Sequence, residues 1–528
     1  TVLFAKSTVF DETYTTSWNN GKTPVTPPKR LGLHVLIPGL SEENVTYEVI
    51  PRNYIHQDTE WMAPSHNQMM KMAADEDILL KNNIYPYADV QLAKRGDELV
   101  AVWIDDNQER TDLNRTQLFT STKTGSAWSS HVSLNQDGTP DFAPAITTTD
   151  TDLLVTWQNF DGVFTEEDSL DEIFKKAEIS VTGEDDSVSL SQDDNYDHSP
   201  VIASIGNQSA MTVWIKSDNH KIPQGGEGTD RLIYSIWNGS SWSAATTLQD
   251  NTPLISDCSI IAGDDRYLLL YSHDSDNDVT TPEDNEVWAR IFDTSSNTWG
   301  EPIRLTENNI QDSNAQGVYF NDDWFITWYQ EDRYVYRHGL TGETLTTESL
   351  ADVSGKIALP RGDTFLALVY QKGGENNNRN LSTLLYDLEK RIWSYEIPLT
   401  SQPGYVRSFS PAFDSDGNLS VLYTHTDIIT EIKDETEYYV PGNNVRLMFT
   451  TYIPKHDLAI VEDDAIILST ENPIPETSVD VTCLVENKGD FAEMATVTLY
   501  DGMPENGVKI GEVTVEQPIP ARSSIPVT

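Results

Sequence analysis

The residues with the clearest potential for chemistry lie in one acidic segment, residues 274–286. Its carboxylates are Asp274, Asp276, Asp278, Glu283, Asp284 and Glu286. The first three alternate with uncharged residues, so their side chains can converge on one ion. Oxygen ligands of this kind suit a hard cation such as Ca²⁺. The spacing therefore predicts a calcium site in this segment, and the alternative interpretation is a solvated acidic loop without an ion.

The alternation resembles the start of an EF-hand calcium loop, in which side chains two positions apart bind the same ion. The segment departs from that motif at its sixth position, where Val279 replaces the glycine that makes the sharp turn. No helices are predicted on either side. The resemblance therefore concerns the ligands and does not extend to the EF-hand fold.

The overall charge is strongly negative. The 528 residues include 84 Asp and Glu against 35 Lys and Arg, which gives a formal net charge of −49. Such a chain repels nucleic acid and anionic membranes and attracts cations or cationic partners. It contains no run of about 18 apolar residues, so we expect no membrane insertion. Its two cysteines, Cys258 and Cys483, do not suggest a disulfide framework.

Aromatic residues that end short apolar runs recur along the chain at intervals of 42 to 57 positions. They are Trp103, Trp157, Trp214, Tyr271, Trp328, Tyr370 and Tyr423. A repeat of this period indicates one β supersecondary unit used many times, as in a β-propeller. Because each of these anchors ends a buried strand, we expect it to pack in the core and not to stack against a sugar.

One repeat can be followed in full over residues 199–248. It contains two apolar strands joined by a tight turn, a polar loop, and two further strands joined by an Asn238-Gly239 turn. Four antiparallel strands make one blade, and the same order over residues 85–452 predicts about seven blades. Residues 77–83 are similar to the fourth strands of other blades, so we predict that this N-terminal strand closes the ring.

The long loops of the repeat belong to one face of the predicted disc. In a four-stranded antiparallel blade, the loop between strands two and three emerges on the same face as the connection between blades. Four such loops are rich in carboxylates. They are residues 105–112, 161–172, 274–286 and 427–437. We call this side the loop face and predict that its rim is strongly negative.

The segments on either side of the propeller, which we assign to residues 76–454, differ from it. Residues 1–75 do not fit the repeat and are expected to be irregular, with a short helix over residues 67–75. Residues 455–528 alternate apolar and polar positions between turn signals, which is typical of a β-sandwich. The fold class is therefore all-β, with about seven four-stranded antiparallel blades followed by an Ig-like β-sandwich.

The C-terminal segment resembles the CARDB modules, which are cell-adhesion-related Ig-like domains of bacterial and archaeal surface proteins. The resemblance rests on Asp457-Leu458, on Val485-Glu486-Asn487-Lys488-Gly489-Asp490 and on Leu499-Tyr500-Asp501-Gly502. It implies an extracellular location and neighbouring modules in a longer chain. Since the last strand of the module is not recognisable, we expect the module to be truncated.

The turns between strands three and four resemble the Asp-box of sialidase-type propellers, a hairpin with serine, aspartate, glycine and tryptophan at fixed positions. Two hairpins match three of the four residues. They are Ser235, Gly239 and Trp242, and Ser121, Gly125 and Trp128. The aspartate position holds Trp237 in one and Lys123 in the other. Asp-boxes are structural, so this resemblance supports the fold and assigns no activity.

A sialidase-like reaction, which this resemblance raises as an alternative, needs arginines for a substrate carboxylate, a tyrosine nucleophile beside a glutamate, and an acid/base aspartate. Arginines that could reach the loop face are Arg110, Arg115, Arg231, Arg333 and Arg379. Carboxylates near strand starts, which could line a central pocket, are Asp89, Asp197, Asp257 and Asp312. No arginine motif of that family is recognisable, and a protein of charge −49 attracts anionic sugars poorly.

Two Arg-Gly-Asp triplets, beginning at Arg95 and Arg361, raise the question of receptor binding. Both stand where the first hairpin of a blade needs a tight turn, and another blade has Gly263-Asp264-Asp265 in that place. Turn chemistry accounts for both triplets.

These observations favour a non-catalytic extracellular or cell-surface protein that serves as a binding or adhesion scaffold. Its partner would be a protein or glycan at the cell surface, bound through the acidic, calcium-binding loop face, and no catalytic residue is assigned. One alternative is a carbohydrate-active propeller enzyme of sialidase-like type. The other is a purely structural segment of a large surface fibre. A propeller fold by itself does not decide among them.

Overall fold

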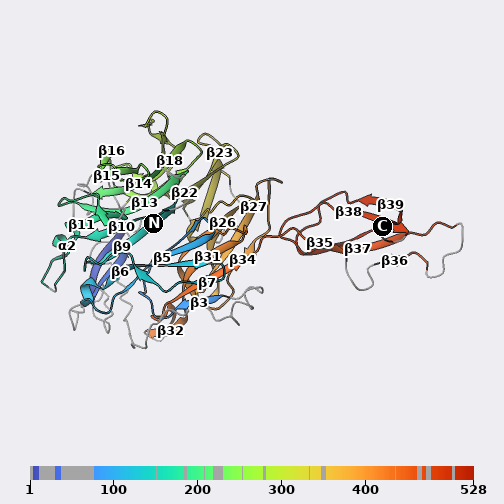
Figure 1. Cartoon of the computed structure of the whole chain (residues 1–528), viewed down its shortest axis with the longest axis horizontal. Coiled ribbons are helices and arrows are strands. Elements are labelled where there is room, and N and C mark those ends of the chain that lie inside the picture. Colours follow the sequence, from blue (N-terminus) through green and yellow to red (C-terminus); the bar gives the residue numbers. More distant parts are fainter. Residues whose placement is uncertain are drawn as a thin grey trace.

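The protein folds into a rounded body of small β-sheets and a slimmer β unit that projects from it (Figure 1). The computed structural model describes residues 4–10, 30–36, 77–149, 152–165, 167–182, 187–206, 209–217, 230–252, 254–276, 281–331, 333–345, 353–433, 436–460, 466–470, 477–501, 503 and 506–528. Almost all regular structure in these residues is strand, and none of their helices is long and apolar enough to cross a membrane.

The rounded body is a propeller of seven blades, each built from successive antiparallel strands. The first strands of blades 1 to 7 are β4 (Val90–Arg95), β9 (Asp141–Thr148), β13 (Tyr196–Ile205), β17 (Ile255–Ala262), β22 (Asp312–Phe320), β25 (Val353–Ala358) and β30 (Tyr405–Phe413). The second strands are β5 (Glu98–Asp106), β10 (Leu153–Phe160), β14 (Ser209–Ser217), β18 (Arg266–Asp274), β23 (Asp323–Gln330), β26 (Phe365–Gly373) and β31 (Leu419–Thr426). The predicted all-β propeller is therefore confirmed.

The outer half of each blade follows the same order. The third strands are β6 (Thr116–Thr124), β11 (Ala177–Thr182), β15 (Asp230–Trp237), β19 (Asn285–Asp293), β24 (Arg333–His338), β27 (Arg379–Asp387) and β34 (Arg446–Tyr452). The fourth strands, several of them split in two, are β7 (Ala127–Trp128) with β8 (Val132–Ser133), β12 (Ser187–Ser189), β16 (Thr246–Thr252), β20 (Thr298–Trp299) with β21 (Ile303–Arg304), β28 (Ile392–Trp393) with β29 (Ile397–Pro398), and β3 (Ile78–Lys81). In blade 5 a single bridge between Tyr336 and Leu345 takes this place.

The fourth strand of blade 7 comes from the N-terminal side of the propeller. β3 pairs antiparallel with β34, the third strand of the last blade. Its Leu80 is fully buried in a core that also contains residues of blades 1, 2 and 7. Lys81 forms a buried ion pair with Asp105 of blade 1 at 2.7 Å. The strand therefore joins the last blade to the first, and β30 of blade 7 lies beside β4 of blade 1.

The seven aromatic anchors lie in the interfaces between blades. All of them are at most 1% exposed. Tyr271, for example, packs among residues of blades 3 and 4, and Trp328 among residues of blades 4 and 5. Each interface is therefore filled by a large ring from one blade resting on apolar strands of the blade before it. This explains why the aromatic type recurs with the period of the blade.

Three segments differ from the sequence-based expectation. β1 (Phe4–Phe10) and β2 (Arg30–Leu36) form an antiparallel hairpin where an irregular segment was expected. β32 (Ile428–Lys433) and β33 (Thr436–Pro441) form a second hairpin within the acidic loop that follows β31. α2 (Leu170–Phe174) is a short helix in the loop of blade 2. The expected helix over residues 67–75 lies outside the described residues.

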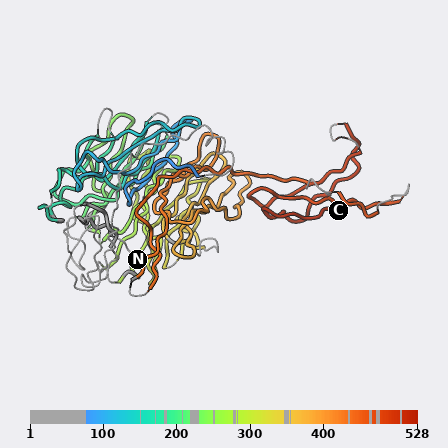
Figure 2. Tube along the Cα trace, turned by 90° about the horizontal axis from the view of Figure 1, so that it is seen from below, coloured from blue at the N-terminus to red at the C-terminus, as the bar shows by residue number. Residues whose placement is uncertain are grey.

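The C-terminal unit contains two small antiparallel sheets, seen side-on in Figure 1 and from below in Figure 2. In one sheet, β37 (Val481–Asn487) pairs with β35 (Leu458–Ile460), β36 (Ile466–Leu468) and β40 (Ser523–Val527). The other sheet pairs β38 (Thr496–Asp501) with β39 (Val508–Thr514). Cys483 is buried in this unit, Cys258 is buried in blade 4, and both are free thiols.

A compact set of contacts joins this unit to the propeller. Phe491 is fully buried, and its ring stacks on Phe365 of blade 6 and on His456. The buried Asp490 carboxylate accepts hydrogen bonds from Tyr452 Oη at 2.5 Å and from the Lys455 backbone N–H at 3.0 Å. These contacts hold the start of the unit against blades 6 and 7, so the connection is packed and not a simple tether.

The closing strand provides a test of the ring. We expect Leu80→Ala to lower the free energy of unfolding of the propeller by about 2–5 kcal/mol, because the substitution leaves a cavity between the first and last blades. Asn82→Ala, at the exposed position that follows this strand, should change it by less than about 0.5 kcal/mol. Urea unfolding followed by tryptophan fluorescence measures both. Equal midpoints for the two variants would contradict the role of β3 in closing the ring.

Candidate functional site

Three of the six predicted calcium ligands lie together at the end of β18. Asp274 ends that strand, and Asp284 ends a short 3₁₀ helix, Pro282–Asp284. One carboxylate oxygen from each of Asp274, Asp276 and Asp284 lies within 4.8 Å of the other two. The backbone N–H of Asp276 donates to Asp284 Oδ2 at 3.1 Å, which fixes the two residues relative to each other.

The carboxylates of this group lie close together, and the charge of one acts on its neighbour. Asp274 is only 3% exposed. Burial raises the pKa of Asp284, and the neighbouring charge of Asp276 raises it further. Oxygen ligands at this spacing suit Ca²⁺, whose charge would offset the repulsion among the carboxylates. The arrangement is therefore chemically able to hold a divalent cation.

The other predicted ligands do not join this group. Glu286 is fully buried, and its Oε1 accepts hydrogen bonds from Arg304 Nη2 at 3.0 Å and from the Asn308 backbone at 2.8 Å. Asp274 pairs with Asn285 across β18 and β19, so the next residue, Glu286, points to the opposite face of the sheet. Its assignment as a ligand is therefore corrected. Glu283 is exposed, and Asp278 lies outside the described residues.

Part of the predicted negative rim is neutralised by ion pairs. Asp112 pairs with Arg115 at 2.5 Å, Asp427 pairs with Arg446 at 2.5 Å, and Asp105 is the buried partner of Lys81. The rim therefore carries less unpaired charge than the count of its carboxylates suggests.

The hairpin β32–β33 gives the loop face a different character. Its exposed apolar and aromatic side chains are Ile429, Ile432, Tyr438 and Tyr439, of which Ile432 is 72% exposed. Ile429 and Ile432 lie on opposite faces of the hairpin, because side chains alternate along a strand. Asn377 Nδ2 donates to the Tyr439 carbonyl at 3.0 Å and ties the hairpin to blade 6. Large exposed apolar groups on a projecting element are typical of a contact surface for a partner.

Bulges mark the starts of the first strands. In blades 2 to 7, the pairing of the first strand with the second shifts register near the aromatic anchor. Side chains at or beside these starts form what we call the axial ring. Its members are Asp89, Ser199, Asp257, Asn314, Lys356 and Arg407. Bulges of this kind are common beside functional sites because they redirect side chains.

Opposite charges face each other across the axial ring. Asp89 and Lys356 interact electrostatically, which lowers the pKa of Asp89 and raises that of Lys356, but burial is the larger effect and shifts each pKa the other way. The guanidinium of Arg407 lies over the ring of Tyr87, 4.4 Å from its centroid, and also contacts Tyr405. Acidic members thus come from blades 1 and 4 and basic members from blades 6 and 7.

Three of the four candidate catalytic carboxylates hold their own blades together. Asp197 Oδ1 accepts from Trp214 Nε1 at 2.6 Å, and Asp312 Oδ1 accepts from Trp328 Nε1 at 2.9 Å. Asp257 accepts from the Ser272 hydroxyl at 3.1 Å and from the backbone N–H of Asn314 in the next blade at 3.0 Å. These oxygens are occupied by fixed donors of the protein, so they serve as structural acceptors. Of the four, Asp89 instead interacts electrostatically with Lys356 of blade 6.

The five candidate arginines do not form one cluster. Arg110 and Arg115 lie in blade 1, Arg231 in blade 3, Arg333 in blade 5 and Arg379 in blade 6. The Arg110 guanidinium donates to the Thr139 carbonyl at 2.6 Å, and Arg115 is paired within its loop. Arg379 lies over Tyr405, 5.0 Å from its ring centroid, and Arg407 contacts the same ring.

Sequence reasoning missed Arg407. The only sequence signal for Arg407 is its position near Tyr405 at the start of a first strand. The repeat predicts that residues at such positions lie near the axis of the propeller.

No family model matches the chain, and no curated protein matches it in sequence. Among solved structures, it is similar to a Trypanosoma rangeli sialidase with 10% identity and a TM-score of 0.37, over 71% of this chain and 56% of the sialidase. A Mycobacterium tuberculosis puromycin-hydrolyzing peptidase shares 10% identity at a TM-score of 0.42, over 82% and 63% of the two chains.

An intramolecular trans-sialidase from Ruminococcus gnavus is similar over 69% of this chain and 94% of its own, with 10% identity and a TM-score of 0.38. The chain thus spans less than two thirds of the length of the first two proteins. At such identities and TM-scores, the similarities do not assign an activity.

The buried carboxyl of Asp197 generates a pH-dependence test. Burial raises its pKa from 3.8 to about 7, so the folded protein keeps this group neutral at low pH, and its contribution to stability is lost as the pH rises from about 4 to about 7. In the variant Asp197→Asn, the amide oxygen can still accept the hydrogen bond from Trp214 Nε1. Asp197→Asn should therefore match the parent near pH 4 and exceed its stability at pH 8, by up to about 4 kcal/mol.

Urea unfolding at pH 4, 6 and 8 measures this difference. Asp194→Asn, at an exposed neighbouring position, should follow the parent at every pH. If the stability difference between Asp197→Asn and the parent does not grow with pH, the raised pKa of Asp197 is contradicted.

Proposed function

We propose that the chain is a non-catalytic binding module of an extracellular or cell-surface protein, and that it binds a partner through the loop face of the propeller. The observation that supports this most directly is the state of the strand-start carboxylates. Asp197, Asp257 and Asp312 are held by donors within the fold, so they are poorly placed to transfer protons to a substrate. The loop face nevertheless presents exposed groups of three kinds: carboxylates, the β32–β33 hairpin and the axial ring.

The partner we propose is a surface protein or glycan, and not a nucleic acid. The apolar side chains of Ile432 and Tyr438 would supply the buried centre of the contact. The surrounding carboxylates would favour a partner with basic groups, because opposite potentials accelerate association and exclude like-charged competitors. The charge of −49 makes the same face unfavourable for polyanions.

Calcium binding is part of this proposal. The ligands are Asp274, Asp276 and Asp284, and Asp278 of the same loop lies outside the described residues. An ion there would link the end of β18 to the start of β19 and stiffen the loop between them. A stiffer loop loses less conformational entropy when a partner binds.

The C-terminal unit is proposed to be a CARDB-like spacer that presents the propeller within a longer chain. Asp490, in the segment that resembles these modules, accepts hydrogen bonds from Tyr452 at the end of β34 and from Lys455, which follows that strand, and Phe491 packs on blade 6. The most specific part of the sequence resemblance therefore lies at the contact with the propeller. A spacer docked in this way would fix the direction in which the loop face points.

A carbohydrate-active enzyme of sialidase-like type is the second candidate. The observation that favours it is the arrangement of Arg379, Tyr405 and Arg407, in which two guanidinium groups contact one tyrosine ring beside Lys356 and Asp89. Such a set could bind a carboxylate near a tyrosine. It lacks the acid/base carboxylate that the reaction needs, unless Asp89 takes that role.

Calcium should raise the melting temperature of the full chain, because an ion that binds only the folded form stabilises it. Asp284→Asn should abolish this rise and raise the melting temperature in the absence of calcium, since it removes one of three mutually repelling carboxylates. Glu283→Gln, an exposed neighbour outside the group, should leave both values unchanged. Differential scanning calorimetry with chelator and with millimolar calcium measures them. No calcium-dependent shift in the parent protein would remove the metal proposal.

The two functions are separated by a hydrolysis assay. We expect the full chain to release no fluorophore from a fluorogenic sialoside or from neutral aryl glycosides. Detectable release that is lost in Asp89→Asn and in Tyr405→Phe, but retained in Tyr438→Phe, would replace the binding proposal with the enzymatic one.

A further inference from the structure

A second candidate site lies on the opposite side of the propeller from the loop face. A cavity of about 740 Å³ opens where the first strands end and turn into the second strands. Blades 1, 2, 3, 4, 6 and 7 all contribute to its walls. Lys94, near the end of β4, lies roughly 16 Å along the strand from Asp89 at its start. We call this the turn face, and the cavity is independent of the loop face.

Most polar groups of the cavity are already bonded to the protein. Thr147 Oγ1 and Ser204 Oγ share a hydrogen bond of 2.8 Å, and Ser204 Oγ donates to the Thr148 carbonyl at 2.9 Å. The Arg361 guanidinium donates to the Tyr319 carbonyl at 2.7 Å. Asp414 accepts from the backbone N–H of Asn418 at 2.8 Å as part of its own turn. These groups shape the walls and are not available to recognise a ligand.

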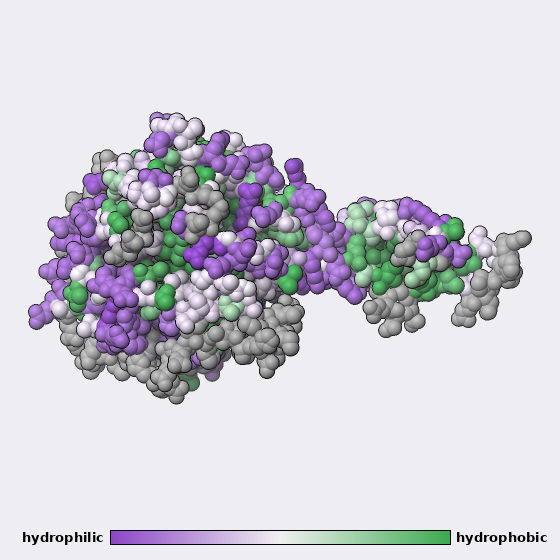
Figure 3. Space-filling model, in the orientation of Figure 1, coloured by the Kyte–Doolittle hydropathy of each residue, from purple (hydrophilic) through white to green (hydrophobic). Residues whose placement is uncertain are grey.

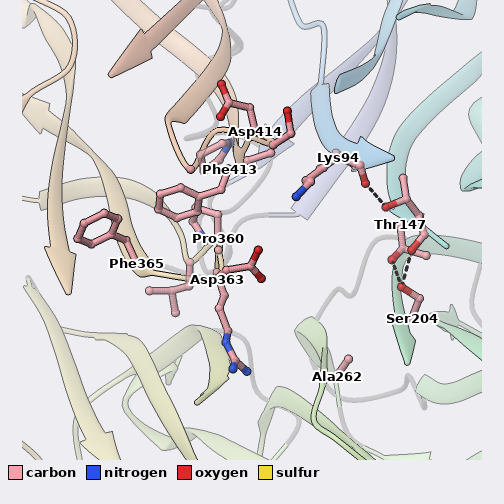
Figure 4. Close-up of a pocket in the computed structure, with 18 of the residues that line it drawn as sticks. Lys94, Thr147, Ser204, Ala262, Pro360, Asp363, Phe365, Phe413 and Asp414 are labelled. Atoms are coloured by element: carbon pink, nitrogen blue, oxygen red, sulfur yellow. Dashed lines mark hydrogen bonds between the residues drawn. The ribbon is translucent and has the colours of Figure 1, made fainter. Parts of the chain in front are cut away.

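Three charged side chains of the cavity, Lys94, Asp363 and Asp416, are not used in this way. Lys94 Nζ and the Asp363 carboxylate have no hydrogen bond or ion pair among the described residues. Figure 4 shows both pointing into the space between the blades from different walls. An unpaired ammonium is notable in a chain whose carboxylates outnumber its cations by more than two to one.

The position of Asp363 is fixed by a tight turn. The backbone N–H of Gly362 donates to the Phe365 carbonyl at 2.8 Å. A Cβ at Gly362 would lie 2.9 Å from Phe413 Cγ, so the turn packs directly on that ring and only glycine fits there. The Arg361-Gly362-Asp363 triplet thus has a structural reason for its glycine, and its aspartate is presented to the cavity by rigid elements. Preorganisation of this kind favours binding.

We propose that this cavity binds a short zwitterionic ligand, a peptide with free termini up to about the size of a tripeptide. Its carboxylate would pair with Lys94 and its ammonium with Asp363, while Ile202, Leu359 and Pro411 contact the body of the ligand. The volume lies within the usual range for small-ligand sites, in which a small number of placed polar groups fix the orientation of the ligand. A neutral sugar would leave both charges desolvated and unpaired, which is unfavourable.

Calorimetric titration of the full chain with trialanine, N-acetyl-trialanine and trialanine amide tests the proposal. Trialanine should bind, and removing either terminal charge should weaken binding at least tenfold. Lys94→Ala and Asp363→Asn should each do the same. Asp97→Asn is the matched control, because it stands in the equivalent Arg-Gly-Asp turn of blade 1 and does not line the cavity.

The peptide series is decisive even where a variant fails to fold. No binding of trialanine at millimolar concentration, equal binding of the capped peptides, or unchanged binding by both Lys94→Ala and Asp363→Asn would overturn the proposal. Since the calcium ligands lie at the opposite ends of the strands, Asp284→Asn should leave trialanine binding unchanged. The outcome is therefore independent of the function proposed for the loop face.

Discussion

The structure depends on closure of the ring by a strand from the far end of the propeller sequence. Each interface between blades combines the aromatic anchor of one blade with apolar strands of the blade before it. Blade 1 has no blade before it in the sequence, so its anchor can pack in this way only if the ring closes and brings blade 7 beside it. Trp103 of blade 1 shares its core with Leu80 of β3 and with Leu447 and Phe449 of β34. The buried Lys81–Asp105 pair adds a directional constraint, because breaking it would leave a buried charge without a partner. The other six interfaces repeat this packing without needing a second terminus.

Closure also separates two kinds of surface. All first strands run from the loop face to the turn face. Each first strand therefore places the residues at its start on the loop face and the residues at its end on the turn face. At the start of these strands, bulges disturb the pairing and expose Asp89, Lys356 and Arg407. At their ends, tight turns place Lys94 and Asp363 around a cavity. The same scaffold can therefore hold two separate binding sites, because the apolar packing between blades depends on the aromatic anchors and not on these charged side chains.

Much of the architecture could be predicted from the sequence, because the anchors are a packing requirement that repeats with the blade. Local interactions within loops were harder to foresee. The helix α2 begins with a capping box in which Ser169 and Glu172 bond reciprocally, a signal that the sequence contains and that the loop assignment overlooked. Glu286 was assigned to the calcium group from its spacing alone, but strand alternation turns it toward Arg304. The sequence predicted only some members of the axial ring, such as Asp89 and Asp257. The register shifts that expose the others do not change the spacing of the aromatic anchors, so the repeat does not reveal them.

The formal charge of the chain is a poor guide to the field that a partner would meet. Some carboxylates act as buried acceptors, and burial raises the pKa of Asp141 to about 8 and that of Asp197 to about 7, so these groups are not fully ionised near neutral pH. Others, such as Glu286, are paired with a cation. The charges are also unevenly distributed, with three carboxylates close together at the end of β18 and the ammonium of Lys94 at the turn-face cavity. Specific recognition would arise from these local departures, because charge spread evenly over a surface is screened by salt within about 10 Å.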